Sequence, residues 1–322
     1  MDKKFNVLTS VKPGEIENTD TGSGSAIANG SGANGSGAGS PKDIYYEISK
    51  VFENLENLDV GAEKGIYSQL DAINARPRRN VRKLAKKGEV DWMKAFVEAP
   101  FQYQEAFLAL RTNINFLAAN RDLKKIIVTS SLPGEGKTSI AVNLSLALSA
   151  ANHKVILIDA DLRKPLIHKY LRLPNGNKMG VTSILQSRDG SSKGCMHHNI
   201  DRKGLSVIPC GVIPPNPTEL LSSQRMQMMI EQLGEIYDYV IIDTPPVSIV
   251  TDAAVLSQYT DGVIFVVKQK DVTFEQARLA KRNLDTVKAN ILGVVINDFD
   301  MKHVDKSNAY YYNYYNYRTK QK

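Results

Sequence analysis

Cysteine is scarce in this chain, whose 322 residues include only Cys195 and Cys210. The two do not form a C-x-x-C pair, and two thiols cannot build a disulfide framework, so we expect reduced thiols and a cytosolic setting. His197 and His198 follow Cys195 closely, but their spacing fits no standard zinc site. We therefore expect an ordinary loop there.

Long apolar runs are also missing. No stretch approaches the roughly 20 residues that a membrane-spanning helix needs. The beginning, M-D-K-K-F-N, lacks the apolar core of a signal peptide. We therefore expect a cytoplasmic protein, which something else must hold if it works at a membrane.

The chain is basic, with a net charge of +7 and a pI near 9.1. This excess favours anionic partners, which include nucleotides, nucleic acids and the cytoplasmic face of a membrane. Part of it lies in one polar piece made of Arg76, Arg78, Arg79, Arg82, Lys83, Lys86 and Lys87. Such a run binds anionic lipid or is simply a solvated linker face. No aromatic residues are interleaved with it and no recognisable reading motif accompanies it, so we expect no nucleic-acid partner.

Composition divides the chain into four parts. Residues 1–40 are rich in Gly, Ser, Ala and Asn and are predicted to be disordered. Residues 41–98 form a basic, partly helical extension. Residues 99–305 carry the pattern of a folded domain. Residues 306–322 form a tail with six of the fourteen tyrosines, which no helix or strand period fits.

The folded part alternates short apolar runs with helical patterns. Such alternation predicts a three-layer α/β domain, with a parallel sheet covered by helices on both faces. The predicted strands are Lys125–Ser130, 155–158, 205–209, 239–242, 263–267 and 291–296. The predicted helices are 104–119, one from the Lys-Thr pair to about Ala151, 223–236, 252–259 and 273–287.

Ser130–Ser139 reads S-S-L-P-G-E-G-K-T-S and lies between the first predicted strand and a helix. This layout is typical of a phosphate-binding loop, in which backbone N–H groups and a helix N-terminus surround a polyphosphate. The loop predicts a site for ATP with Mg²⁺, in which Lys137 approaches the phosphates and Thr138 the metal. The predicted nucleotide-binding residues are Ser131, Pro133, Gly134, Glu135, Gly136, Lys137, Thr138, Ser139 and Asn297. Asn297, after the last strand, is expected near the adenine or as a plain turn residue.

Carboxylates follow two other predicted strands. Asp243 ends V-I-I-D and resembles the Walker B residue that holds Mg²⁺. Asp159 and Asp161 lie two residues apart in I-D-A-D-L-R, which suits activation of a protein hydroxyl as well as metal binding. We assign Asp159 as the base that accepts the proton and Asp161 as a metal-shell group. Arg163 is predicted to orient these carboxylates or to neutralise transferred charge. The alternative is a salt-bridged turn.

Together these motifs resemble the bacterial tyrosine kinases of capsular and exopolysaccharide synthesis. The resemblance runs from about Pro100 to the C-terminus. Its carriers are the phosphate loop, I-D-A-D-L-R, V-I-I-D-T-P-P, the segment P-P-N-P-T-E-L-L-S-S at 214–223 and the tyrosine-rich tail. Related division-site and partition ATPases carry a signature lysine where this chain has Leu132, which favours the kinase branch.

The resemblance implies tyrosine phosphorylation by ATP, with trans-autophosphorylation of the tail in a ring of identical subunits. It further implies an activating tail of a membrane polysaccharide co-polymerase, which places the kinase at the inner face of the membrane, and a protein-tyrosine phosphatase as a further partner. The implied phosphoacceptors are Tyr310, Tyr311, Tyr312, Tyr314, Tyr315 and Tyr317. Family members carry E-x-x-R-x-x-R before the first strand. Here Glu105 and Arg111 flank Leu108, so we expect a weaker or differently built ring.

Two other functions compete with this interpretation. An ATPase switch would use nucleotide state to control assembly or membrane recruitment, but it has no use for six clustered tyrosines. A scaffold that binds nucleotide without turnover would not need the complete set of catalytic groups.

Overall fold

The computed structural model describes residues 7–11, 101–119, 121–187, 193–200, 204–269 and 271–298. All of these residues belong to one structural unit. The predicted helical pieces in 41–98 and the tyrosine-rich tail lie outside the described residues. The four-part division of the chain therefore stays a prediction.

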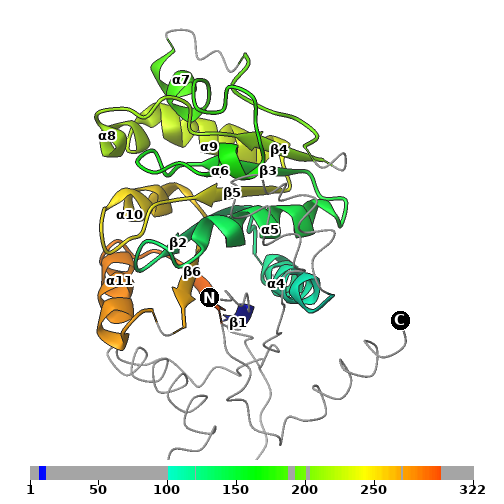
Figure 1. The fold of residues 1–322 in the computed structure, drawn as a ribbon, viewed down its shortest axis with the longest axis vertical. Helices are drawn as coiled ribbons and strands as arrows, with labels where there is room; N and C mark the ends of the chain where they lie inside the picture. The colour runs from blue at the N-terminus through cyan, green and yellow to red at the C-terminus, as the bar shows by residue number, and fades with distance from the viewer. Residues whose placement is uncertain are drawn as a thin grey trace, which may run out of the picture. The chain divides into compact units, whose positions relative to one another are not determined.

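Seven strands form a single sheet in the order β1-β7-β6-β2-β5-β3-β4 (Figure 1). The six strands from β2 to β7 pair in parallel, which confirms the predicted parallel sheet. Their bounds are β2 Lys125–Ser130, β3 Val155–Asp159, β4 Leu205–Ile208, β5 Tyr239–Asp243, β6 Gly262–Lys268 and β7 Ile291–Asn297.

The central strands are continuous apolar runs because both of their faces are covered. Every residue of the central strands β3 and β5 is buried, and so is every residue of the edge strand β4. An alternating pattern would instead have left one face for water. The hydrophobic core is therefore made of the buried strands and of the helix side chains that pack against the two faces of the sheet.

The helices connect the strands in chain order. Their bounds are α4 Phe101–Ala119, α5 Lys137–Ser149, α6 Ile167–Tyr170, α7 Val181–Gln186, α8 Pro217–Leu221, α9 Gln224–Ile236, α10 Asp252–Leu256, the 3₁₀ turn η1 Ser257–Tyr259 and α11 Phe274–Thr286. The predicted helix at 252–259 is thus α10 followed by one 3₁₀ turn. The short helices α6, α7 and α8 carry too few residues for a period to be read, so the sequence did not indicate them.

Crossovers between parallel strands are right-handed, so connections that run in opposite directions along the sheet lie on opposite faces. The connection from β2 to β3 through α5 runs along the sheet toward β4. The connections through α9, α10 and α11 run back toward β7. One face is therefore covered by α5 with α4 packed against it, and the other by α9, α10 and α11 (Figure 1).

Side chains cap two of these helices. The Ser223 hydroxyl accepts a hydrogen bond from the backbone N–H of Met226 at the start of α9. Thr273 and Gln276 form a reciprocal capping box at the start of α11. Each cap satisfies N–H groups that have no partner inside the helix.

β1, Val7–Val11, corrects one expectation. It lies in the segment predicted to be disordered, yet it pairs antiparallel with β7, with Val7 opposite Asn297 and Val11 opposite Gly293. The composition of residues 1–40 as a whole hides this strand, because the sequence V-L-T-S-V is short and β7 offers a free edge only once the sheet has formed. The other residues of that segment lie outside the described residues.

α4 carries the sequence that departs from E-x-x-R-x-x-R. Leu108 is half-buried. Arg111 Nη1 donates a hydrogen bond to the Ala147 carbonyl oxygen at 3.0 Å, so this arginine ties α4 to α5 within the chain. A role for Glu105 and Arg111 between subunits stays a prediction.

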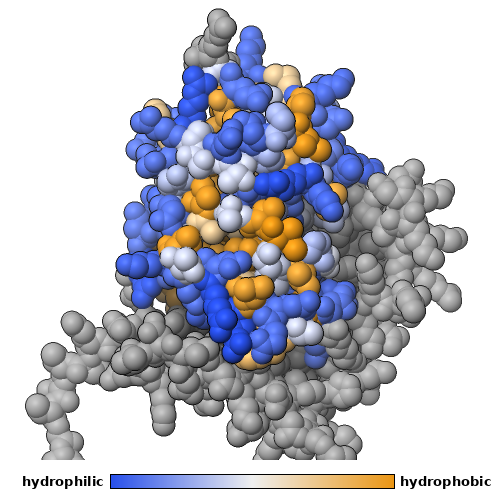
Figure 2. Space-filling view, turned by 90° about the vertical axis from the view of Figure 1, so that its left-hand side faces the viewer, coloured by the Kyte–Doolittle hydropathy of each residue, from blue (hydrophilic) through white to orange (hydrophobic). Residues whose placement is uncertain are grey.

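Exposed apolar side chains occur on the face of α10 and α11, where Figure 2 shows orange patches between polar ones. Ile249, before α10, is 59% exposed, and Leu279 on α11 is 52% exposed. Among the described helices, none combines the length and the apolar character that a membrane crossing requires.

Phe107 offers a test of the packing of α4. Its ring is fully buried and packs edge-on against Tyr103. We expect Phe107→Ala to lower the free energy of unfolding by roughly 3–5 kcal/mol, because it removes buried apolar area and leaves a cavity. Urea unfolding followed by circular dichroism measures this change.

Phe116 on the same helix is the matched control, since it is 70% exposed. Phe116→Ala should change the free energy of unfolding by no more than about 0.5 kcal/mol. Equal losses for the two variants would contradict the described packing of α4.

Candidate active site

The loop between β2 and α5 has the conformation that binds phosphate. Gly134 and Gly136 have φ angles of 87° and 91°, in a region that side chains disfavour. α5 begins at Lys137, directly after Gly136. The free N–H groups and the positive end of its dipole therefore lie at this loop, as anion binding requires.

Glu135 holds the phosphate loop in place from within. Its side chain is almost fully buried, and its carboxylate accepts hydrogen bonds from the backbone N–H groups of Leu132 and Lys268. Burial raises the pKa of Glu135, and these hydrogen bonds offset part of that rise. Lys268 ends β6, so the carboxylate ties the loop to the neighbouring strand.

Asn297, at the end of β7, holds the same loop from outside. Its Nδ2 donates to the Glu135 carbonyl oxygen at 2.8 Å, and its Oδ1 accepts from the backbone N–H of Asp298 at 3.0 Å. The side chain also lies close to Gly136, where an added Cβ would be 2.2 Å from Nδ2. The structure thus places Asn297 on the phosphate loop, and its approach to an adenine stays a prediction.

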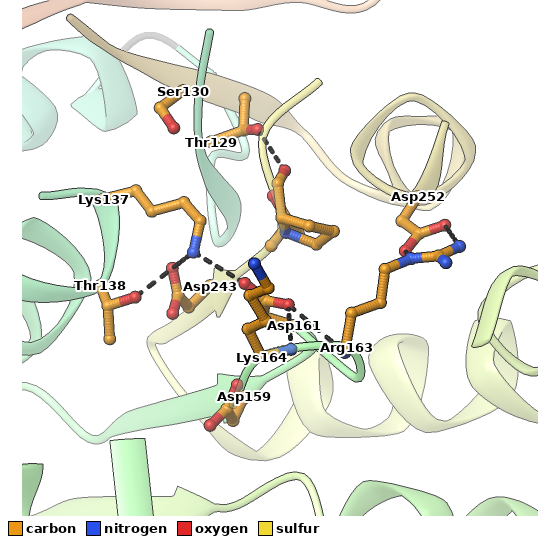
Figure 3. Close-up of polar contacts among 12 residues, drawn as sticks. Thr129, Ser130, Lys137, Thr138, Asp159, Asp161, Arg163, Lys164, Asp243 and Asp252 are labelled. Carbon is orange, nitrogen blue, oxygen red and sulfur yellow. Dashed lines mark hydrogen bonds and ion pairs between the residues drawn. The ribbon is translucent and has the colours of Figure 1, made fainter. Parts of the chain in front are cut away.

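Acidic side chains surround Lys137 at the carboxyl ends of β3 and β5 (Figure 3). The two strands pair so that Asp159 and Asp243 are neighbours in register. Lys137 Nζ lies 2.9 Å from Asp161 Oδ2 and 3.9 Å from Asp243 Oδ1. It also lies 3.4 Å from the Thr138 hydroxyl. The fold therefore brings together the loop lysine and all three predicted carboxylates.

Burial and charge shift the proton affinities of these groups. Burial raises the pKa of Asp159 well above its ordinary value, and the negative charge of Asp243 adds to the rise. Burial likewise raises the pKa of Asp243 to about 6, against the opposing effect of Lys137. Burial alone would lower the pKa of Lys137, but the carboxylates around it outweigh that effect and raise it.

Asp159 and Asp161 differ in their hydrogen bonds. Both oxygens of Asp161 are used, Oδ2 by Lys137 and Oδ1 by the backbone N–H of Lys164 at 3.0 Å. Asp159 Oδ2 accepts from the backbone N–H of Ile167 at 3.1 Å, while its Oδ1 is buried without a partner among the described residues. Of these two carboxylates, Asp159 alone therefore keeps an oxygen without a hydrogen-bond partner among the described residues.

Arg163 points to a different carboxylate from the predicted ones. Its Nε lies 2.8 Å from Asp252 Oδ2 and its Nη2 lies 3.2 Å from Asp252 Oδ1. It reaches Asp161 only through its backbone N–H, which lies 3.4 Å from Oδ1. The guanidinium therefore anchors the turn after β3 instead of contacting Asp159 or Asp161.

A family model described as the NUBPL iron-transfer P-loop NTPase of the ParA group matches residues 122–320, more than half of the chain. Tyrosine-protein kinase YwqD of Bacillus subtilis is 38% identical over 68% of this chain and 89% of its own length. The chain belongs to the bacterial tyrosine-protein kinases, within the P-loop NTPases.

Other members of the tyrosine-protein kinases agree with this assignment. CpsD of Streptococcus pneumoniae is 37% identical over 64% of this chain and 88% of its own length. The kinase domain of Escherichia coli tyrosine kinase ETK is 33% identical, covers 60% of this chain and 74% of the solved chain, and has a TM-score of 0.57. The likeness thus extends from the sequence to the fold.

A bacterial tyrosine kinase of the P-loop type binds nucleotide, typically with Mg²⁺, and the residues here fit that metal. Both carboxylate oxygens of Asp243 are buried, and neither has a hydrogen-bond partner among the described residues. With the Thr138 hydroxyl, they form an all-oxygen donor set of the kind that Mg²⁺ prefers. The described residues contain no group of three or more His, Cys, Asp or Glu side chains placed to hold a metal. Mg²⁺ does not need such a group, because proteins usually bind it through one or two carboxylates together with the phosphates of the substrate.

The sequence reasoning missed Asp252 and Thr218. Asp252 is fully buried at the start of α10, and Thr218 lies in the first turn of α8. The T-D-A-A start of a helix was the only local signal for Asp252, and it reads equally well as a plain helix start. The tail tyrosines lie outside the described residues.

Gly136 tests how closely Asn297 closes over the kinase's phosphate loop. We expect Gly136→Ala to weaken ATP binding by at least about tenfold, because the Cβ would meet Asn297 Nδ2 at 2.2 Å in addition to the strain at positive φ. Titration with a fluorescent ATP analogue measures the dissociation constant.

Gly134→Ala is the matched control, since Gly134 has a similar φ but no atom within 4 Å of an added Cβ. It should weaken binding less, and Asn297→Ala should restore part of the affinity that Gly136→Ala loses. If both glycine variants bind ATP equally well, the described contact has no effect on the loop.

Proposed function

We propose that this chain is an ATP-dependent protein-tyrosine kinase that phosphorylates its own C-terminal tyrosines in trans and regulates capsular or exopolysaccharide synthesis. The observation that supports it best is the cluster at the strand ends. A phosphate loop supplies Lys137, which pairs with Asp161, and Asp159 two residues earlier lies beside Asp243 in register, so the cluster has more carboxylates than the single one that activates water.

Each residue of the cluster has a proposed role. Lys137 neutralises charge on the transferred phosphoryl group, and the N–H groups of the loop hold the phosphates. Thr138, Asp161 and Asp243 hold Mg²⁺ directly or through water. When bound, Mg²⁺ neutralises charge that develops on the phosphate oxygens.

Asp159 is the proposed base. In the reaction, the phenol proton passes to Asp159, the phenol oxygen bonds to the γ-phosphorus of ATP, and the bond from that phosphorus to the β–γ bridging oxygen breaks as ADP leaves. Burial raises the pKa of Asp159 above that of an ordinary carboxyl group, which makes its carboxylate a stronger proton acceptor. Its unpartnered Oδ1 provides the acceptor atom.

The proposed partners follow from the family resemblance. They are further copies of this chain in a ring, the cytoplasmic tail of a membrane polysaccharide co-polymerase as activator, and a protein-tyrosine phosphatase that reverses the modification. The activator would hold the kinase at the inner face of the cell membrane. The ATPase switch has less support, because Leu132 stands in place of the signature lysine.

Lys137 provides the central test. The full chain is incubated with Mg·ATP, with and without a co-polymerase tail peptide, and phosphate is mapped by mass spectrometry. We expect phosphate on Tyr310–Tyr317 in the wild type. We expect none in Lys137→Met, because this change removes the positive charge that approaches the phosphates. Lys154→Met is the matched control, since Lys154 is exposed before β3, at the opposite edge of the sheet.

Three outcomes separate the hypotheses. Phosphotyrosine that persists in Lys137→Met would exclude this site as its source. ATP hydrolysis without phosphotyrosine under either condition would favour the switch. Phosphate on other tyrosines, with the tail unmodified, would reject the tail as the acceptor.

Asp159→Asn tests the proposed base. We expect ATP affinity within about twofold of the wild type and phosphotransfer slower by about 10²–10⁴-fold, which is the usual contribution of a general base. Single-turnover transfer and an ATP titration measure the two effects. Unchanged transfer at intact ATP affinity would exclude Asp159 as the base.

A further inference from the structure

Asp252 is a fully buried carboxylate that the proposed reaction does not use. Arg163 binds both of its oxygens, with contacts of 2.8 Å and 3.2 Å. The Thr218 hydroxyl donates to Asp252 Oδ1 at 2.7 Å and accepts from Arg163 Nη2 at 2.9 Å. Arg163, Thr218 and Asp252 thus form a closed triangle of charged and polar contacts, hereafter the Arg163 triad (Figure 3 shows the Arg163–Asp252 contact).

The triad joins the connections that leave three neighbouring strands. Arg163 lies in the turn after β3, Thr218 in α8 after β4, and Asp252 at the start of α10 after β5. β3 lies between β4 and β5 in the sheet, and α8 contacts α10. The triad therefore links three segments that are far apart in the sequence and fixes their positions relative to one another.

The same turn after β3 also holds a residue of the site. The backbone N–H groups of Arg163 and Lys164 lie 3.4 Å and 3.0 Å from Asp161 Oδ1. Asp161 Oδ2 in turn binds Lys137 Nζ at 2.9 Å. A displacement of Arg163 therefore moves the N–H groups that orient Asp161.

Burial of the Asp252 carboxylate makes the triad costly to open. A carboxylate that is out of contact with water must keep its charged partner, because an unpaired buried charge is strongly destabilising. The planar guanidinium matches both carboxylate oxygens at once, which fixes direction as well as distance. The Thr218 hydroxyl serves both partners and so completes the arrangement.

The phosphate loop does not depend on this triad for its own position. It is held by Glu135 and Asn297, which tie it to β6 and β7 on the other side of β2. The backbone of the phosphate loop and the orientation of Asp161 therefore rest on different sets of contacts, which meet at the Lys137–Asp161 ion pair. A change in the triad should affect phosphotransfer without a matching change in ATP affinity.

We propose that Thr218 and Asp252 are positioning residues for phosphotransfer, which act by holding Arg163 so that the turn after β3 orients Asp161 against Lys137. The proposal rests on the proposed kinase function of the same site. It also explains why Arg163 turns away from the two carboxylates that precede it in the chain. Neither Thr218 nor Asp252 needs to touch a substrate in this role.

Thr218→Val and Thr218→Ser form a matched pair for the test. Val keeps the shape of Thr without the hydroxyl, whereas Ser keeps the hydroxyl. In the full chain with Mg·ATP, we expect Thr218→Val to lower the single-turnover rate of tyrosine phosphorylation by about tenfold, the loss typical of one hydrogen bond to charged groups. Thr218→Ser should stay within about twofold of the wild type, and both variants should keep wild-type ATP affinity.

Arg163→Lys tests the same triad from its other side. Lysine keeps the charge but cannot bind both oxygens of Asp252 in one plane. We expect a loss of rate like that of Thr218→Val, and the double variant should be no slower than the slower single variant, because both changes disrupt one unit. This pair keeps the test decisive even if one substitution prevents folding.

The outcomes distinguish this inference from the proposed function. A wild-type chain that makes no phosphotyrosine overturns the proposed function and the inference with it. A wild type that is active, with Thr218→Val and Arg163→Lys equally active, overturns the inference alone. So does a Thr218→Val variant whose ATP affinity falls as much as its rate, or a Thr218→Ser variant that is as slow as Thr218→Val.

Discussion

The site depends on a buried charge balance between one lysine and the carboxylates at the ends of two adjacent strands. Lys137 lies 2.9 Å from Asp161 and 3.9 Å from Asp243, and Asp159 stands beside Asp243 in register. Burial raises the pKa values of Asp159 and Asp243, and the negative charge of neighbouring carboxylates adds to the rise. This excess of acidic groups over basic ones suits a divalent cation such as Mg²⁺.

Two separate supports keep that cluster in shape. On one side, Glu135 and Asn297 tie the phosphate loop to β6 and β7. On the other, Arg163 ties the turn after β3 to the buried Asp252. Loops at the carboxyl ends of parallel strands carry the chemistry of α/β proteins, and a rigid scaffold must position them. Each support uses a buried acidic side chain, Glu135 or Asp252, whose two oxygens accept hydrogen bonds from groups in different segments of the chain.

The N-terminal strand β1 lies next to the strand that supports the phosphate loop. β1 pairs with β7 so that Val7 stands opposite Asn297, the residue that holds the phosphate loop from outside. An edge strand with unpaired backbone groups is a site for further pairing. In this chain, its own N-terminal residues take that place.

The sequence by itself determined the elements and the chemistry that are local along the chain. The six parallel strands, the phosphate loop and the acidic residues that end two strands are contiguous patterns, and runs such as V-I-L-I-D predict a buried strand followed by a carboxylate. Caps such as Ser223 and Thr273 are equally local. The family resemblance rested on these same motifs and agrees with the comparisons.

Only the tertiary structure decided which of these groups meet. The guanidinium of Arg163 binds Asp252, which is 89 residues away, and Asn297 binds Glu135, which is 162 residues away. β1 became a strand only because β7 offers it an edge. A hydrogen bond between distant residues depends on strand order and crossover direction, and no local pattern of the chain records these. The partners of a side chain therefore follow from the assembled sheet, whereas its presence at a strand end follows from the sequence.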